Sequence, residues 1–162
     1  MLYENLLLKA DEMGLVVKDK PLQSSDGRIC GNKIAIRQGL EKSVKCAVLA
    51  EEIGHFKTGA GNILNQSTIE EQKQECKARR WGYDLLVGLE GIINAYEAGC
   101  SNLFEMSKHL CISADFLSEA LQSYKERYGI FVEYQNYIIY FSPSLAVFKM
   151  FESEGENEKN ID

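Results

Sequence analysis

The alternation of hydrophobic and polar residues predicts one helix and three short strands at the start of the chain. Over residues 3–13 hydrophobic side chains recur every three or four positions, which is the spacing of an amphipathic helix, and Gly14 ends it. Leu15-Val16-Val17 predicts a short strand. Residues 28–37 indicate a hairpin that turns at Gly31-Asn32, because their second half alternates as a half-buried strand does.

The middle of the chain is predicted to be helical. A long helix is expected over residues 42–58, and Gly59-Ala60-Gly61-Asn62 after it is a flexible link. Overlapping capping patterns that begin at Ser67-Thr68 open a second long helix, which extends to about Val87. Three shorter helices are expected over residues 89–98, from a Ser101 cap to Leu110, and from a Ser113 cap to Tyr128.

The chain is predicted to end in a hairpin and a charged tail. Residues 130–134 and 137–141 predict strands joined across Gln135-Asn136, and residues 145–151 form a last apolar segment. Residues 152–162 are acidic and lack aromatic side chains, which is typical of disorder.

These patterns predict an α+β fold with a small mixed or antiparallel sheet and a helical C-terminal portion. We expect residues 1–88 to form the core, residues 89–151 a helical accessory region with a hairpin, and residues 152–162 a disordered tail. With 162 residues, of which 45% are hydrophobic, the chain suits one domain with a substantial core.

Composition and charge indicate a cytoplasmic protein. The net charge of -6 argues against nucleic acid as a main partner, since phosphate binding needs a basic face. No apolar stretch has the length of a membrane span, and the first residues carry an early acid without the basic leader of a signal peptide. The five cysteines are odd in number and scattered, so we expect free and mostly buried thiols.

One predicted helix combines hydrophobic residues with three ionisable ones. In Cys46–Phe56, which reads C-A-V-L-A-E-E-I-G-H-F, the side chains of Glu51, Glu52 and His55 fall within an arc of about 100°. The helix is otherwise apolar nearly all round, which is typical of a buried helix. Burying two carboxylates and an imidazole is unfavourable unless a cation or a hydrogen-bond network compensates them. A metal site is the simplest explanation.

The spacing gives these three residues different places around an ion. Glu51 and His55 are four residues apart, about 6 Å along the helix axis, so both can reach one ion. Glu52 points about 100° away from Glu51, a position that suits a general base. Catalytic sites with one metal ion usually have three protein ligands, so a third ligand is expected elsewhere. His109 is far along the chain, and we expect it to be a surface or partly buried side chain.

Glu75 is the better candidate for the third ligand. It lies one turn before an inward-facing stripe of the second long helix, formed by Ala78, Trp81, Gly82, Leu85 and Leu86. The small residues Ala78 and Gly82 would let the two long helices approach closely. An acid at the edge of this stripe, facing two more acids, is repelled unless a cation is present. The pattern therefore favours a metal site of Glu51, His55 and Glu75.

Simpler interpretations of the same residues remain open. The pattern E-E-x-x-H is frequent on solvated helix faces, and Lys45 lies about 20° from Glu52 around the helix, so the two could form a surface pair. Glu75 could pair with Arg79 one turn later. Cys76, next to Glu75, keeps a thiolate ligand as an alternative.

The two helix motifs occur in a fixed order and spacing. The first is L-A-E-E-I-G-H-F, and the second consists of Glu75, Ala78, Trp81 and Gly82. Together they resemble the ImmA/IrrE family of metallo-endopeptidases, in which a helix ending in E-L-G-H is followed by a helix of the form E-x-x-A-x-x-F/W-A. The resemblance covers roughly residues 2–86, and the C-terminal part resembles accessory helices of phage-type members.

The resemblance implies a fold and an activity. It implies a reduced zincin-like core, made of the motif helix, the second ligand helix and a small sheet. It also implies a Zn²⁺-dependent endopeptidase that cleaves a helix-turn-helix repressor of a phage or mobile element. By the resemblance Glu52 is the general base, and His55 and Glu75 are metal ligands. Glu51 occupies the first ligand position, which is normally a histidine.

The glutamate at position 51 changes the charge expected for the site. Two histidines and one carboxylate carry a net charge of about +1 with a divalent ion, whereas one histidine and two carboxylates are neutral. A less positive centre acidifies bound water less and polarises a peptide carbonyl less. Oxygen ligands also make Mn²⁺ or Fe²⁺ alternatives to zinc. The alternative function is a catalytically weak or inactive relative that acts as a protein-binding or transcription-regulating module.

Two further segments concern the partner. In zincin-like enzymes a peptide adds as a strand to the sheet edge above the motif helix, and Lys33–Arg37 is the expected edge by its position before that helix.

Residues 106–121 look like a helix-turn-helix, which suggests DNA binding or repressor docking. Because the second of these helices begins with Asp115 and Glu119, we expect a protein contact there rather than DNA binding.

Overall fold

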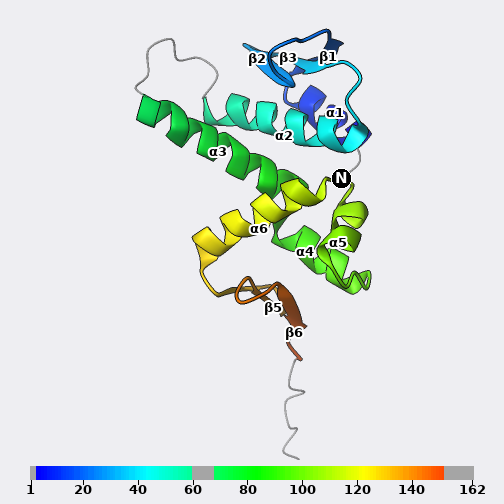
Figure 1. Cartoon of the computed structure of the whole chain (residues 1–162), viewed down its shortest axis with the longest axis vertical. Coiled ribbons are helices and arrows are strands. Elements are labelled where there is room, and N and C mark those ends of the chain that lie inside the picture. Colours follow the sequence, from blue (N-terminus) through cyan, green and yellow to red (C-terminus); the bar gives the residue numbers. More distant parts are fainter. Residues whose placement is uncertain (1–2, 60–67, 152–162) are drawn as a thin grey trace, which may run out of the picture.

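The computed structural model describes residues 3–59 and 68–151, which form six helices and two small sheets (Figure 1). The elements in chain order are α1 (Tyr3–Glu12), β1 (Val16–Lys20), β2 (Gly27–Cys30), β3 (Lys33–Arg37), α2 (Lys42–Thr58), α3 (Thr68–Leu86), α4 (Gly88–Glu97), α5 (Leu103–Leu110), α6 (Ala114–Tyr128), β4 (Phe131–Tyr134), β5 (Tyr137–Tyr140) and β6 (Ala146–Lys149). The α+β class expected from the sequence is confirmed. In these two ranges no helix is both long and apolar enough to cross a membrane.

The first sheet is mixed, and β3 is its central strand. β2 and β3 form the expected antiparallel hairpin, while β1 pairs with β3 in parallel, which gives the order β1-β3-β2. The expectation that Lys33–Arg37 is the sheet edge is therefore wrong. The physical reason is that β1 extends to Lys20 and pairs with β3 along its whole length. Ile34 and Ile36 of this strand are accordingly buried.

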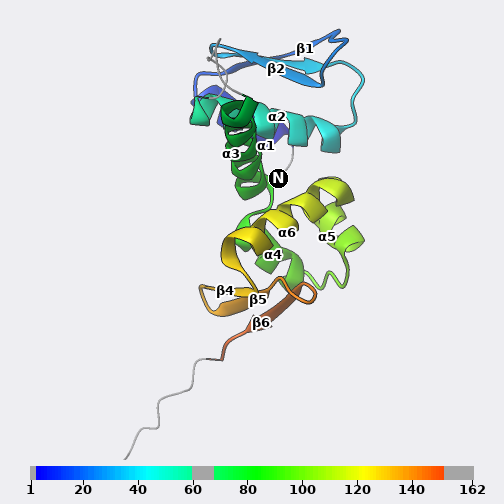
Figure 2. The ribbon, with the colours of Figure 1, turned by 60° about the vertical axis from the view of Figure 1, so that its left-hand side comes forward.

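The helix α2 lies between the first sheet and α3, as Figure 2 shows from the side. Its buried hydrophobic residues are Cys46, Leu49, Ala50 and Ile53. The helix begins and ends at the expected residues, and Gly59 closes it in the left-handed conformation with a φ of 73°. The prediction of a buried helix holds for its middle, where six of the 17 residues are buried, and not for its ends, where Phe56 is 38% exposed.

Small residues let α2 and α3 pack closely. A Cβ added at Gly54 would lie 2.3 Å from the carbonyl oxygen of Ala78, so the two backbones are almost in contact there. One turn further along α3, Gly82 faces Ala50 at a normal packing distance, with a built Cβ 3.5 Å from its carbonyl carbon. Ala78 and Gly82 are buried, as the expected inward stripe requires. The stripe thus determines how near the two helices come.

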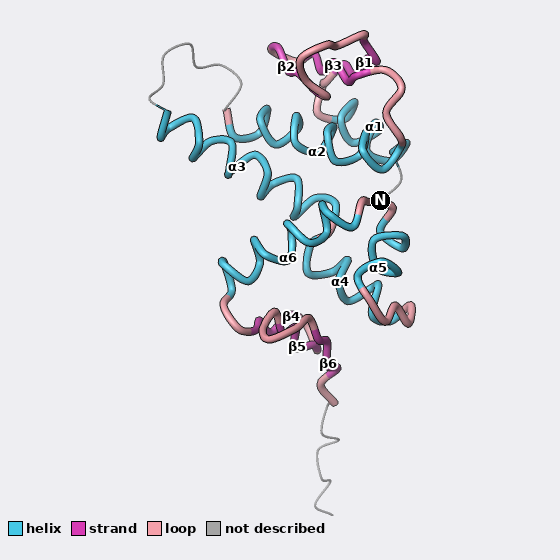
Figure 3. The backbone as a smooth tube through the Cα atoms, in the orientation of Figure 1, coloured by secondary structure: helices cyan, strands magenta, loops and turns pink. Residues whose placement is uncertain are grey.

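The remaining helices and the second sheet continue from the end of α3 (Figure 3). The second sheet is antiparallel, with the order β4-β5-β6. The predicted hairpin is confirmed, and the last apolar segment contributes the third strand. Ser113 caps α6 as expected, since its hydroxyl accepts a hydrogen bond from the Phe116 amide. The cap of α5 is Asn102 rather than Ser101, because the Asn102 side chain accepts from the amide of Glu105.

The two halves of the chain share one hydrophobic core. The buried side chains run without a break from Leu6 of α1 to Phe141 after β5. A hydrogen bond from the Tyr83 hydroxyl to Glu119 (2.9 Å) and an ion pair between Arg127 and Asp84 (3.0 Å) also join α3 to α6. The division at residue 88 stays a prediction. Residues 60–67, with the expected link and the Ser67 cap, and the tail 152–162 lie outside the described residues.

Gly54→Ala is expected to destabilise the fold. The new Cβ would overlap the Ala78 carbonyl, so α2 and α3 must separate, at a cost of about 1–3 kcal/mol. Gly82→Ala is the matched control, because its Cβ would make an ordinary contact and alanine favours a helix by about 0.5–1 kcal/mol over glycine. Urea unfolding followed by circular dichroism measures both. A Gly54→Ala variant as stable as Gly82→Ala would contradict the close packing.

Candidate metal centre

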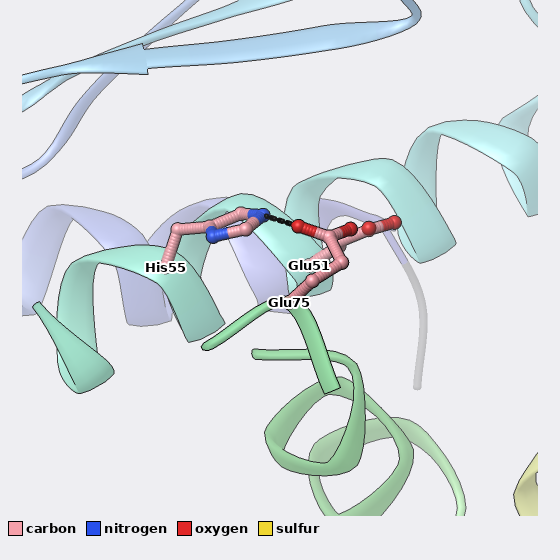
Figure 4. Close-up of side chains that lie close together, drawn as sticks. All are labelled: Glu51, His55 and Glu75. Carbon is pink, nitrogen blue, oxygen red and sulfur yellow. Dashed lines mark ion pairs between the residues drawn. The ribbon is translucent and has the colours of Figure 1, made fainter. Parts of the chain in front are cut away.

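Three ionisable side chains from two helices converge on one side of α2. Glu51 and His55 come from α2 and Glu75 comes from α3 (Figure 4). One ligand atom of each residue lies within 4.8 Å of the other two. The imidazole nitrogen Nε2 of His55 lies 3.5 Å from Glu75 Oε2. The structure thus brings together the three residues that the sequence pattern selected as ligands.

The close packing of α2 and α3 places these side chains. Gly54 precedes His55 directly, and Ala78 lies one turn after Glu75. Because the backbones nearly touch at Gly54 and Ala78, the start of α3 is held beside the end of α2. Glu51 and His55 are one turn apart on the same face, so the carboxylate of Glu75 meets both.

The donor set fits a divalent cation. Two ligands at about 2.0–2.2 Å from one tetrahedral ion lie about 3.3–3.6 Å apart. The separation of 3.5 Å between His55 and Glu75 already matches this value. The widest separation, at most 4.8 Å, needs to close by about 1 Å, which rotation of a glutamate side chain supplies. Two carboxylates and one imidazole suit Zn²⁺, Mn²⁺ or Fe²⁺.

Arg79 adds a positive charge to this group. Its Nε lies 3.4 Å from Glu51 Oε1 and 3.4 Å from Glu75 Oε1. The pair with Glu75 within α3 was one of the interpretations open from the sequence. The contact with Glu51 depends on how α2 and α3 pack, so no sequence signal indicated it. The Arg79 side chain is 53% exposed, and such pairs contribute little to folding stability.

Glu52 lies on a different face of α2, against the first sheet. Its side chain is only 9% exposed. A Cβ added at Gly27 of β2 would lie 2.5 Å from Glu52 Oε1 and 2.6 Å from Val48 Cγ1, so the carboxyl packs where position 27 has no side chain. Lys45, the suggested surface partner of Glu52, contacts Asp19 of β1 instead. The interpretation of Glu52 as part of a solvated surface pair is therefore wrong.

Glu51 and Glu52 have raised pKa values, so they hold their protons more tightly than isolated carboxyl groups. Burial raises the pKa of Glu52 to about 7, and the negative charges of Glu51 and Glu75 add to the shift. Burial also raises the pKa of Glu51, and its hydrogen bond with Glu75 raises it further, while Arg79 opposes the shift. A divalent cation beside Glu51 would favour the ionised form of its carboxyl group.

The other residues considered from the sequence lie outside the group. His109 is exposed on α5, as expected for a surface side chain. None of the cysteines, all of which lie in the described residues, forms a disulfide, but the expectation that most are buried is wrong, since Cys30, Cys76 and Cys111 are exposed. Cys30 directly precedes a turn and Cys111 lies in one, where side chains reach solvent. Cys76 neighbours Glu75 in sequence and is not one of the three grouped residues.

Comparison with known proteins supplies no relative. No family model, no curated protein and no solved structure matches this chain. The grouping of Glu51, His55 and Glu75 therefore stands on geometry and donor chemistry alone.

The stability of the metal-free protein is expected to fall as the pH rises from about 4.5 to about 7. In this window folded Glu52, with a pKa of about 7, keeps a proton that the unfolded chain, with its ordinary value of 4.5, has released. The loss amounts to about 3 kcal/mol and is complete above pH 7. Urea unfolding at several pH values, in the presence of a chelator, measures it.

Glu52→Gln cannot titrate and should lose this part of the pH dependence. Glu70→Gln, which changes an exposed acid on α3, is the control and should keep it. Parallel stability curves for Glu52→Gln and the unchanged protein would contradict the burial argument.

Proposed function

We propose that this protein is a metal-dependent endopeptidase built on a reduced zincin-like core of α2, α3 and the first sheet. The observation that carries the proposal is the convergence of Glu51, His55 and Glu75 between two closely packed helices. The sequence resemblance to the ImmA/IrrE family supports it. By that resemblance the substrate is a helix-turn-helix repressor of a phage or mobile element, and the protein acts in the cytoplasm.

In this proposal the residues divide the chemistry between them. Glu51, His55 and Glu75 hold a zinc ion, with Mn²⁺ or Fe²⁺ as alternatives. When bound, the ion supplies Lewis acidity toward a peptide carbonyl and toward water. Glu52 acts as the general base. Its burial beside Gly27 keeps the carboxyl out of bulk water and in one position.

The strand β2 is the sheet edge that suits a substrate. In the order β1-β3-β2 it pairs with β3 on one side only, within the part of the chain that the structure describes. Peptides bind to such edges by adding a strand. A peptide along β2 would pass Gly27, where the absence of a side chain leaves the Glu52 carboxyl next to the backbone. The edge and the general base therefore lie on the same side of α2.

A second candidate function is a catalytically weak or inactive relative that binds a protein or regulates transcription. The carboxylate of Glu51 in the first ligand position favours this alternative, because it makes the centre less positive. Leu103 and Phe104 of α5 are 40% and 64% exposed, which suits a protein contact. Asp115 and Glu119 are exposed near the start of α6, which disfavours DNA there.

Protein purified without an affinity tag is expected to contain about one equivalent of a divalent transition metal. Glu75→Ala should lose most of it, because the ion loses one of three ligands. Glu71→Ala is the matched control, since Glu71 is an exposed acid one turn earlier on α3. Elemental analysis by plasma mass spectrometry measures the metal. Equal metal content in the two variants would remove Glu75 from the site.

Glu52→Gln should keep the metal and lose cleavage of the cognate repressor. Loss of a general base slows such reactions by about 10²–10⁴-fold. Gel electrophoresis and mass spectrometry of the repressor measure cleavage, and elemental analysis confirms that the ion is retained. Undiminished cleavage by Glu52→Gln would overturn the mechanism. A metal-loaded wild-type protein that binds the repressor without cutting it would favour the second candidate function.

A further inference from the structure

Arg79 contacts one carboxylate oxygen of each of two proposed ligands. The two carboxylate oxygens of Glu75 have different neighbours. Oε1 is 3.4 Å from Arg79 Nε, and Oε2 is 3.5 Å from His55 Nε2. On Glu51 it is Oε1 that faces Arg79, also at 3.4 Å. Glu75 thus has a second oxygen for an ion while the guanidinium stays in place, and the Glu51 carboxylate has a second oxygen that Arg79 Nε does not contact. A guanidinium keeps its charge at all physiological pH values.

The charge of Arg79 offsets that of the unusual ligand Glu51. Glu51 and Glu75 bring two negative charges, Arg79 brings one positive charge and a divalent ion brings two. With a neutral His55, the loaded centre carries a net charge of about +1. A centre of two histidines and one carboxylate has this same charge. Without Arg79 the loaded centre would be neutral.

We infer that Arg79 is a positioning residue that compensates the carboxylate at position 51, so that the Glu51–Arg79 pair replaces a neutral imidazole. This inference rests on the proposed function. In this role Arg79 weakens the affinity for a divalent cation, because it repels the ion and shares its carboxylates. It strengthens the affinity for an anion at the same centre. Negative charge that develops on a substrate carbonyl oxygen benefits in the same way.

A positive charge on the same helix that does not contact the ligands would have much smaller effects, because solvent and salt screen it, and Arg80 provides this comparison. Arg80 is the next residue on α3 and is also exposed. Among the ion pairs of the described residues none involves Arg80. Arg80→Ala therefore removes an equal charge from the same helix without touching Glu51 or Glu75.

The test uses Co²⁺ as the ion and azide as the anion. Metal-free wild type and the variants Arg79→Ala, Arg79→Lys and Arg80→Ala are titrated with Co²⁺ and followed by visible absorption. The Co²⁺ forms are then titrated with azide. Arg79→Ala is expected to bind Co²⁺ about five- to tenfold more tightly and azide several-fold more weakly. Arg79→Lys, which keeps the charge, should stay close to wild type, and Arg80→Ala should not differ from it.

The double variant Glu51→His/Arg79→Ala sharpens the test. It restores the net charge with a true imidazole, so its azide affinity should return toward that of wild type. If Arg79→Ala binds Co²⁺ and azide as Arg80→Ala does, or if the double variant stays as weak as Arg79→Ala, the compensating role is wrong. A wild-type protein that binds no Co²⁺ would overturn the metal centre itself, and this inference with it. Circular dichroism checks that each variant is folded.

Discussion

The contact between the backbones of α2 and α3 at Gly54 is the constraint on which the proposed centre depends. A side chain at this position would meet the Ala78 carbonyl at 2.3 Å, so only glycine allows the observed approach. The approach brings Glu75 to His55 and Arg79 to Glu51, and each of these pairs joins the two helices. Packing of small residues, and not attraction between the charges, therefore sets the positions of the ionisable groups. In the proposed function, these charges favour the binding of a divalent cation.

The helix α2 uses two faces for two environments. Toward α3 it presents Glu51 and His55, which are partly accessible to solvent. Toward the sheet it presents Glu52, which is buried beside Gly27. Adjacent positions in the sequence thus differ in their exposure to solvent. This separation follows from helical geometry alone, because consecutive residues point about 100° apart.

The parts of the structure that depend on local spacing could be predicted from the sequence. The bounds of α2, the turn at Gly31-Asn32 and the grouping of Glu51, His55 and Glu75 follow from residues close in the chain or on one helix stripe. The parallel pairing of β1 with β3 could not, because hydrophobic alternation does not say which strands become neighbours. For the same reason the sequence does not reveal which strand is the sheet edge. The contact of Arg79 with Glu51 depends on how α2 and α3 pack, which local spacing does not indicate.

Because the three grouped residues come from two helices, the binding of an ion would depend on the folded arrangement of α2 and α3. An ion held by Glu51, His55 and Glu75 binds only when α2 and α3 are docked, since no one helix carries the whole set. By mass action such an ion would stabilise the docked state by about 2.7 kcal/mol at a hundredfold excess over its dissociation constant. That energy is comparable to a large part of the stability of many small domains. The tertiary structure of this protein would then report on the availability of metal in its surroundings.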